Sequence, residues 1–244
     1  MNVTRIAGAL RKRARARRLG LNLWRSEAFT APNVVTLHGK RVALRLPREQ
    51  GVDVAFSELL FADCYGLEDA PGPVRTVLDI GGNVGLFAVA ARLAFPDAII
   101  HSYEPNPNLE PYLSAQAEAA NSKYFLEAVE LEDCHVRLNF HEDSVQTTSQ
   151  VDASSEIPAT AFRKTVERLG GSVDFAKVDC EGAEWRIWQD REAWQKVRTL
   201  STEYHIMDGH THEEAHEVIS GLGFQVLHQE RADTFGVIRA VRGR

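Results

Sequence analysis

The spacing of apolar residues changes repeatedly along the C-terminal two thirds of the chain. Short β-branched and aliphatic runs, typical of buried strands, alternate with longer segments in which apolar residues recur at helical spacing. Strands that alternate with helices form parallel sheets, so the pattern predicts an α/β fold with a doubly wound, mostly parallel sheet. The last two strands have a short connection, and we expect the final strand to be antiparallel. The predicted strands are 75–80, 98–103, 123–128, 135–140, 145–151, 175–178, 197–203, 224–228 and 235–241, and the predicted helices are 85–95, 107–120, 161–169, 183–194 and 211–222.

The first part of the chain has a different pattern. We predict a short helix over 4–19, a hairpin over 33–46 and a helix over 54–61. The Pro- and Gly-rich run 69–73 interrupts any regular element. We therefore expect an N-terminal segment of basic helix, hairpin and helix over residues 1–69, and a main domain over residues 70–244.

Charge is distributed unevenly over this chain of 244 residues. Residues 1–25 contain eight basic and no acidic side chains, whereas the whole chain has a net charge of −6, so the remainder carries −14. A basic helix can bind an anionic membrane surface, but its apolar face here consists of only Ile6 and Leu10, which favours a solvated arm. The acidic remainder argues against nucleic-acid binding.

Composition narrows the class of protein. A hydrophobic content of 44% and a charged content of 25% are typical of a globular domain and exclude a disordered or collagen-like chain. No apolar run approaches the ~18 residues of a membrane span, and no signal peptide is expected. The three cysteines are far apart and form no CxxC pair, so the cytoplasm is the expected compartment.

A glycine-rich loop follows the first predicted strand of the main domain, in Asp79-Ile-Gly-Gly-Asn-Val-Gly85. Ligands of open α/β sheets bind at the carboxyl ends of the strands, so this loop is a candidate ligand site. A dinucleotide fingerprint would need glycines where Asn83 and Leu86 stand, and no Gly-Lys-Ser/Thr of a phosphate-binding loop follows. The loop therefore favours a nucleoside ligand without a pyrophosphate.

Two acids specify that ligand further. Glu104 ends the second strand, where a carboxylate can accept both ribose hydroxyls, and Asp79 offers an acid to a cationic amino group. S-adenosylmethionine has both features. The predicted cofactor-binding residues are Asp79, Gly81, Gly82, Asn83, Gly85, Glu104, Pro105 and Asn106.

Three ordered motifs resemble those of the FkbM-type family of class I methyltransferases. They are Asp79 to Gly85, Tyr103-Glu-Pro-Asn-Pro107, and Asp174 to Glu184, which contains the run Lys177-Val-Asp-Cys-Glu-Gly182. The similarity extends over about residues 55–205, with departures at Gly82 and Cys180 that remove no functional group. The resemblance implies a Rossmann-like sheet and an S-adenosylmethionine-dependent O-methyltransferase that acts on a hydroxyl of a natural product, sugar or glycan.

Methyl transfer to a hydroxyl requires removal of a proton, because an alcohol is a poor nucleophile. Asp179 and Glu181 follow the fourth parallel strand, beside the expected position of the methyl group, and His205 follows the fifth. We predict these three as the catalytic residues, with His205 as the preferred base because an imidazole titrates near neutral pH. A divalent ion on Asp179 and Glu181 would also activate a hydroxyl, but the spacing does not require one.

Several alternatives stay open at this point. The acceptor could be a nitrogen atom, or the domain could bind a nucleoside without catalysis. His212-Glu-Glu-Ala-His216 matches a zinc-protease pattern, although the short helix favours a structural role. Tyr65 could close over the cofactor, and the polar residues His141, Asp143 and Ser144 could line the pocket.

Overall fold

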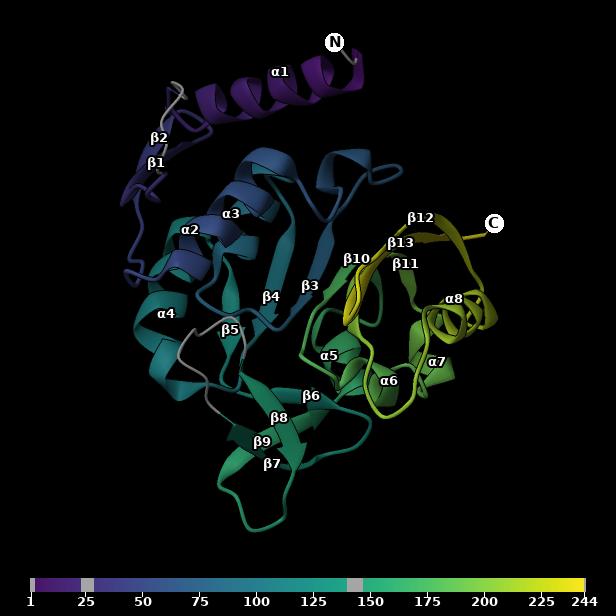
Figure 1. Ribbon diagram of the computed structural model, residues 1–244. Helices are drawn as coiled ribbons and strands as arrows, with labels where there is room; N and C mark the ends of the chain where they lie inside the picture. Colours follow the sequence, from purple (N-terminus) through teal and green to yellow (C-terminus); the bar gives the residue numbers. More distant parts are fainter. Residues whose placement is uncertain (1–2, 23–28, 140–146, 244) are drawn as a thin grey trace.

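The computed structural model describes residues 3–22, 29–139 and 147–243, and it is built around a seven-stranded sheet (Figure 1). The order of the strands is β12-β13-β11-β10-β3-β4-β5. Strands β11, β10, β3, β4 and β5 are parallel, whereas β13 is antiparallel to both of its neighbours. This confirms the predicted fold class. The strands are β3 (Thr76–Ile80), β4 (Ile99–Tyr103), β5 (Lys123–Phe125), β10 (Val173–Val178), β11 (Val197–His205), β12 (Phe224–Arg231) and β13 (Phe235–Arg242).

Helices cover both faces of this sheet because its central strands are apolar on both sides. Val77 of β3 belongs to one hydrophobic core, whereas Leu78 and Ile80 of the same strand belong to a second core. Successive side chains of a strand point to opposite faces, so the sheet lies between two packed layers. The helices of the main domain are α3 (Leu86–Ala94), α4 (Glu110–Ala120) with a preceding 3-10 turn η3 (Pro107–Leu109), α5 (Phe162–Arg168), α6 (Glu184–Ile187), α7 (Arg191–Trp194) and α8 (His212–Gly221).

Two expectations about these elements were wrong. The helix predicted over 183–194 is two short helices, because the Asp190 side chain accepts a hydrogen bond from the Ala193 amide and begins α7. The strand predicted over 123–128 ends at Phe125. Ala128 begins a strand of a different sheet.

That second sheet has four strands in the order β6-β9-β7-β8 and projects from one end of the molecule (Figure 1). Its strands are β6 (Ala128–Glu130), β7 (Cys134–Asn139), β8 (Thr148–Val151) and β9 (Ile157–Ala161). Strand β9, which contains Pro158, was not predicted from the sequence. Residues 145 and 146 of the strand predicted over 145–151, and the polar residues His141, Asp143 and Ser144, lie outside the described residues.

The N-terminal segment packs on the main domain. It consists of α1 (Val3–Arg18), the hairpin β1 (Val34–Leu37) and β2 (Lys40–Ala43), α2 (Gln50–Phe56), a π-helical continuation η1 (Ser57–Ala62) and the 3-10 turn η2 (Leu67–Asp69). Buried residues of this segment share one hydrophobic core with α3. No helix in the described part of the chain is both long and apolar enough to span a bilayer.

The solvated arm expected at the N-terminus is only partly correct. Leu10 is 59% exposed, but Leu19, just after α1, is fully buried. A guanidinium nitrogen of Arg15 lies 2.5 Å from Asp63 and 2.8 Å from Glu68. The last turn of α1 is therefore fixed to the body of the protein, and the preceding residues 8–14 are exposed.

Candidate active site

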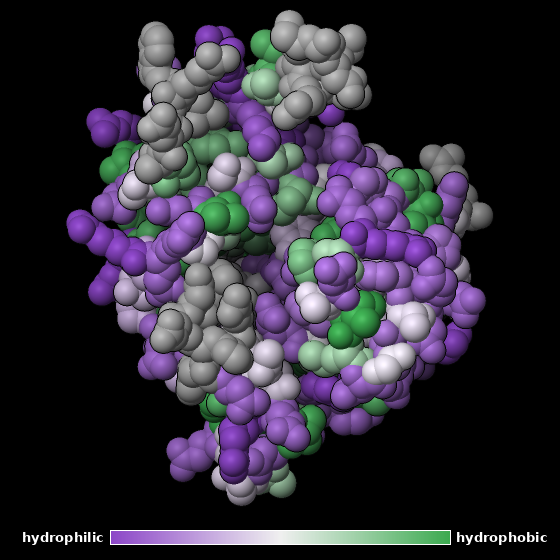
Figure 2. Space-filling model, in the orientation of Figure 1, coloured by the Kyte–Doolittle hydropathy of each residue, from purple (hydrophilic) through white to green (hydrophobic). Residues whose placement is uncertain are grey.

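A cavity of about 990 Å³ lies at the carboxyl ends of β3, β4, β10 and β11. The face shown in Figure 2 is largely hydrophilic and is hollowed near its centre. One part of the cavity wall is the glycine loop with Glu104 and Pro105, and a second part is Lys177 to Glu181 with Glu203 and His205. The remaining walls come from α2 and η1 of the N-terminal segment, from β6, β7 and β8 of the four-stranded sheet, and from the hairpin of β12 and β13.

The glycine loop is shaped by contacts with two neighbouring strands. The amides of Gly81 and Gly82 both donate to the Tyr103 carbonyl, at 3.0 and 2.9 Å. Gly81 has a φ of +79°, and a Cβ atom there would lie 1.7 Å from the backbone oxygen of Asp179. Only glycine fits at position 81, because both the left-handed backbone and the close approach exclude a side chain.

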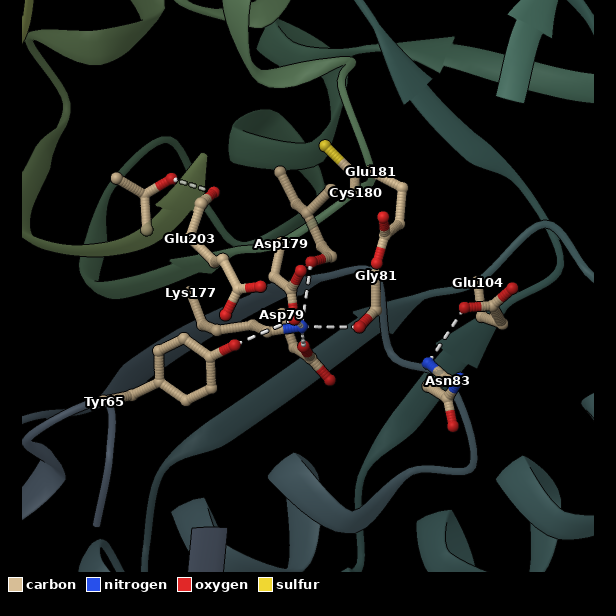
Figure 3. Close-up of polar contacts among 12 residues, drawn as sticks. Tyr65, Asp79, Gly81, Asn83, Glu104, Lys177, Asp179, Cys180, Glu181 and Glu203 are labelled. Atoms are coloured by element: carbon tan, nitrogen blue, oxygen red, sulfur yellow. Dashed lines mark hydrogen bonds and ion pairs between the residues drawn. The ribbon is translucent and has the colours of Figure 1, made fainter. Parts of the chain in front are cut away.

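Glu104 joins this loop to the end of β4. One carboxylate oxygen accepts from the Asn83 amide at 2.8 Å (Figure 3). The other accepts from the Asn106 amide, also at 2.8 Å. Burial raises the pKa of Glu104, although these two hydrogen bonds act in the opposite direction. A carboxylate has about four acceptor positions, so each oxygen can still accept one ribose hydroxyl.

The other predicted cofactor residues fall into two groups. Gly81, Gly82, Asn83 and Pro105 line the cavity with Glu104. Asp79, Gly85 and Asn106 are absent from the described lining, and the carboxylate of Asp79 is completely buried beneath the loop. The ammonium contact that we expected for Asp79 is not supported by this position, because Asp79 faces Lys177 instead.

Lys177 is the centre of a buried ionic network. Its ammonium lies 3.4 Å from Asp79 and 3.5 Å from Asp179, and it donates to the carbonyls of Gly81 at 2.5 Å and Ile80 at 3.2 Å (Figure 3). Burial acts to lower the pKa of Lys177, but the charges of Asp179 and Asp79 outweigh it and raise the pKa. A permanent cation thus connects the glycine loop to the end of β10.

From the sequence, Lys177 was recognised only as part of a motif. A signal was nevertheless available, because Lys177 and Asp179 are two residues apart and therefore point to the same face of a strand. Lys177 also pairs in register with Asp79 on the adjacent β3.

Tyr65 lines the cavity and contacts Asp179. Its hydroxyl donates to a carboxylate oxygen of Asp179 at 2.8 Å, and its ring meets the Phe87 ring edge-on at 5.7 Å. Burial, followed by the charge of Asp179, raises the pKa of Tyr65 well above its usual range. The hydroxyl therefore stays protonated and orients Asp179.

Asp179, Glu181 and His205, the three predicted catalytic residues, all line the cavity. The His205 Nε2 atom lies 3.3 Å from Glu181 and 3.8 Å from Glu203, and its Nδ1 atom lies 3.5 Å from the buried Glu184. Burial raises the pKa of Glu181 to about 7 and that of Glu203 to about 8.

The reason we gave for His205 as the base does not hold. Burial acts to lower its pKa, but the hydrogen bond and charge of Glu184, together with Glu181, raise it to about 9. The imidazole is then a cation at neutral pH and has no free lone pair. Glu203, which the sequence analysis did not select, lies on the same strand two residues before His205 and lines the same cavity.

Comparison with known proteins agrees with the motifs. No family model matches the chain. A curated relative, the 31-O-demethyl-FK506 methyltransferase FkbM of Streptomyces tacrolimicus, is 25% identical, and the match covers 72% of this chain and 82% of the relative. The resemblance to FkbM-type methyltransferases is confirmed. The chain is an S-adenosylmethionine-dependent methyltransferase.

Several solved structures match most of this chain at low sequence identity. A fibrillarin pre-rRNA processing protein of Methanococcus jannaschii matches with a TM-score of 0.49 and 10% identity, over 90% of this chain and 86% of that protein. A precorrin-6y C5,15-methyltransferase of Geobacter metallireducens matches with a TM-score of 0.46 and 13% identity, over 83% of this chain and 93% of that protein.

The two histidines of the zinc-protease pattern, His212 and His216, have structural roles in this methyltransferase. The two ring nitrogens of His212 lie 2.9 Å from the Tyr204 hydroxyl and 2.9 Å from the Ala232 carbonyl, so both already have protein partners. His216 Nδ1 lies 3.1 Å from the side-chain oxygen of Gln229. Within residues 3–22, 29–139 and 147–243, no group of three or more His, Cys, Asp or Glu side chains is arranged to hold a metal ion.

Proposed function

We propose that this methyltransferase transfers a methyl group to the hydroxyl oxygen of a small molecule such as a natural product, sugar or glycan. The observation that carries the proposal is the group of acids Asp179, Glu181 and Glu203 in the cavity at the ends of β10 and β11. A neutral amine needs little help from a base, whereas an alcohol must lose its proton during attack. The name of the curated relative, which specifies a 31-O position, also favours oxygen.

The residues around the glycine loop would hold S-adenosylmethionine. Glu104 would accept the ribose hydroxyls, Gly81 to Asn83 would contact the nucleoside through their backbone, and Pro105 would lie on the adenosine side. When bound, the cofactor supplies an electrophilic methyl group on a sulfonium. Asp79 would act indirectly, because it holds Lys177 and through it the carbonyl of Gly81.

The acceptor would lie between the N-terminal segment and the last hairpin. Val54 of α2 and Phe235 of β13 both line the cavity and are 48% and 38% exposed. These apolar side chains fit an acceptor with an apolar part. The acids Glu58 and Glu230 of the same cavity would repel a polyanion such as RNA, so we do not propose a nucleic-acid acceptor.

Three residues would position the acceptor. Asp179, oriented by Tyr65 and Lys177, would accept a hydrogen bond from the attacking hydroxyl. The Glu181 and His205 pair would border the same position, and the positive charge of His205 would limit repulsion among the carboxylates. Correct placement of the hydroxyl can itself supply a large part of the rate enhancement.

We keep as a proposal the division of the chain into an N-terminal segment, residues 1–69, and a main domain, residues 70–244. Both parts would be needed for function. Cys64 and Tyr65 and parts of α2 and η1 line the cavity, so residues 70–244 by themselves would form an incomplete acceptor pocket. The cytoplasmic location also stays a prediction, as does the minor role given to membrane contact of the basic N-terminus.

The test is methyl transfer from radiolabelled S-adenosylmethionine to 31-O-demethyl-FK506 and to a panel of sugars and polyketide alcohols. We expect a product whose mass is higher by one methylene group and which is stable under conditions that cleave amides. The rate of methyl transfer should be the same in the presence of EDTA. Inhibition by EDTA would indicate an added metal ion. Transfer only to amines or RNA, or no binding of S-adenosylhomocysteine in calorimetry, would contradict the proposal.

A further inference from the structure

Glu203 has few contacts with the protein. Its carboxylate lines the cavity and its side chain is 27% exposed. The nearest oppositely charged atom is His205 Nε2 at 3.8 Å, and among the described residues no hydrogen bond to this carboxylate is found within 3.5 Å. Glu203 therefore has lone pairs that are free to accept a proton from a molecule in the cavity.

The neighbouring groups are already engaged. Asp179 accepts a hydrogen bond from Tyr65 and faces the Lys177 ammonium. His205, held between Glu181 and Glu184, is a cation at neutral pH. The contacts of Asp179 occupy one of its carboxylate oxygens, and the cationic imidazole of His205 has no free lone pair.

The register of the sheet places Glu203 beside the reaction position. Val178 of β10 pairs with Thr202 of β11, so the next residues, Asp179 and Glu203, follow at the same level on adjacent strands. Figure 3 shows Glu203, Asp179 and Tyr65 converging, with Glu104 farther away beyond Lys177.

We propose that Glu203 is the general base that accepts the proton of the acceptor hydroxyl. This inference rests on the proposed function. The acceptor oxygen forms a bond to the methyl carbon, the carbon–sulfur bond breaks with its electron pair returning to sulfur, and the hydroxyl proton moves to a carboxylate oxygen of Glu203. The products are the methyl ether, neutral S-adenosylhomocysteine and the protonated side chain, which then returns its proton to water.

The surroundings of Glu203 suit this role. Burial, and then the charge of Asp179, raises its pKa to about 8, while His205 acts to lower it. A base is most effective when its pKa lies near the working pH. The other charged or titratable groups near it are Glu181 and Lys177, together with Cys64 and Tyr65 of the N-terminal segment.

The first test needs no acceptor. A bound sulfonium should drive a proton from Glu203, whereas the neutral sulfur of S-adenosylhomocysteine should not. Calorimetry at pH 7.5 in two buffers of different ionisation enthalpy measures this release. We expect S-adenosylmethionine to release more protons than S-adenosylhomocysteine from the wild type and from the exposed control Glu217→Gln, and the difference to disappear in Glu203→Gln. An unchanged difference in Glu203→Gln would overturn the proposal, whereas failure of the wild type to bind either compound would overturn the proposed function.

The second test is kinetic and uses the alcohol that the wild type methylates fastest. Glu203→Gln should lower kcat by about 100-fold or more, with the affinity for S-adenosylhomocysteine within about twofold of the wild type as evidence of an intact fold. The rise of kcat with pH should be lost in this variant, and Glu203→Asp should recover part of the rate. A kcat of Glu203→Gln within a fewfold of the wild type, with the same pH profile, would refute the role.

Discussion

Individual residues of the site are held by a few specific contacts, and Glu104 is the clearest case. We expect Glu104→Gln to bind S-adenosylhomocysteine about 10- to 100-fold more weakly, because hydrogen bonds to a charged group contribute about 1.5–3 kcal/mol. An amide also cannot accept on both of its heteroatoms, so the contact with either Asn83 or Asn106 is lost. Calorimetry measures the affinity.

Glu110→Gln is the matched control for this change, since Glu110 is an exposed carboxylate at the start of α4. Its affinity should equal that of the wild type. Equal affinity of Glu104→Gln and the wild type would show that Glu104 does not hold the ribose.

Two glycines have a left-handed backbone, but only one of them lies close to other atoms. Alanine substitutions at the two positions therefore distinguish the energetic cost of the backbone conformation from the cost of a steric clash. Gly170, with a φ of +90°, has no atom within 4 Å of an added Cβ, whereas at Gly81 the backbone of Asp179 is in the way. Gly170→Ala should lower the free energy of unfolding by about 1–2 kcal/mol, the conformational cost alone. Gly81→Ala should lower it by clearly more, as measured by urea denaturation. Similar losses in the two variants would mean that the loop can move away from β10.

Sequence reasoning found the residues that belong to a motif and missed those defined by packing. Glu104 and the glycine loop were identified because their spacing matches a ligand-binding turn. Glu203 belongs to no motif, and its free carboxylate depends on the partners taken by Asp179 and His205. The two-residue spacing of Glu203 and His205 on β11 was the available signal that both face the cavity.

At the scale of elements, α1 divides into an exposed part and an anchored part. Removal of residues 1–13 should leave the melting temperature unchanged, because residues 8–13 are exposed. Removal of residues 1–19 should destabilise the protein, since burial of Leu19 alone contributes about 1.5–3 kcal/mol and Asp63 would lose its partner Arg15. Thermal unfolding of the two truncated chains makes the comparison, and equal melting temperatures would show that the anchor is dispensable.

Strands and helices that consist of an uninterrupted apolar run between Pro or Gly residues could be predicted from the sequence. Elements that contain a proline or a cap within the run could not. Strands β3, β4, β10 and β11 lie where the pattern placed them, because each is buried on both faces. Strand β13 was also located correctly, from the alternation of its buried and half-buried residues. Strand β9 was missed because Pro158 reduces its strand signal, although the strand pairs with both β6 and β7. The break between α6 and α7 is caused by the N-terminal cap that the Asp190 side chain forms. This break could not be predicted, because the tryptophans in this segment have a helical spacing that suggests one continuous helix.

For the whole molecule, the acids and the histidine of the cavity predict how stability depends on pH. The folded protein raises the pKa of Glu181 and Glu203 from 4.5 to about 7 and 8, and that of His205 from 6.5 to about 9. The folded state therefore binds more protons than the unfolded state between about pH 5 and 9. Stability should fall as the pH rises through this interval.

Melting temperatures measured from pH 5 to pH 9 test this expectation. Glu203→Gln should flatten the decline between about pH 5 and 8, because the substituted side chain no longer titrates, whereas Glu217→Gln should follow the wild type. A melting temperature that rises with pH across this range would show that the cavity acids are ionised as easily in the folded protein as in the unfolded chain.

The walls of the cavity come from separate stretches of the chain, and this has an evolutionary consequence. The donor side is built from the glycine loop and Glu104, whereas α2 and η1 contribute much of the opposite wall. Mutations in residues 50–62 can therefore reshape the opening for new alcohols while the donor side is preserved. An exchange of residues 50–62 between homologous enzymes should therefore transfer the specificity for the alcohol. The affinity for the methyl donor should stay nearly constant.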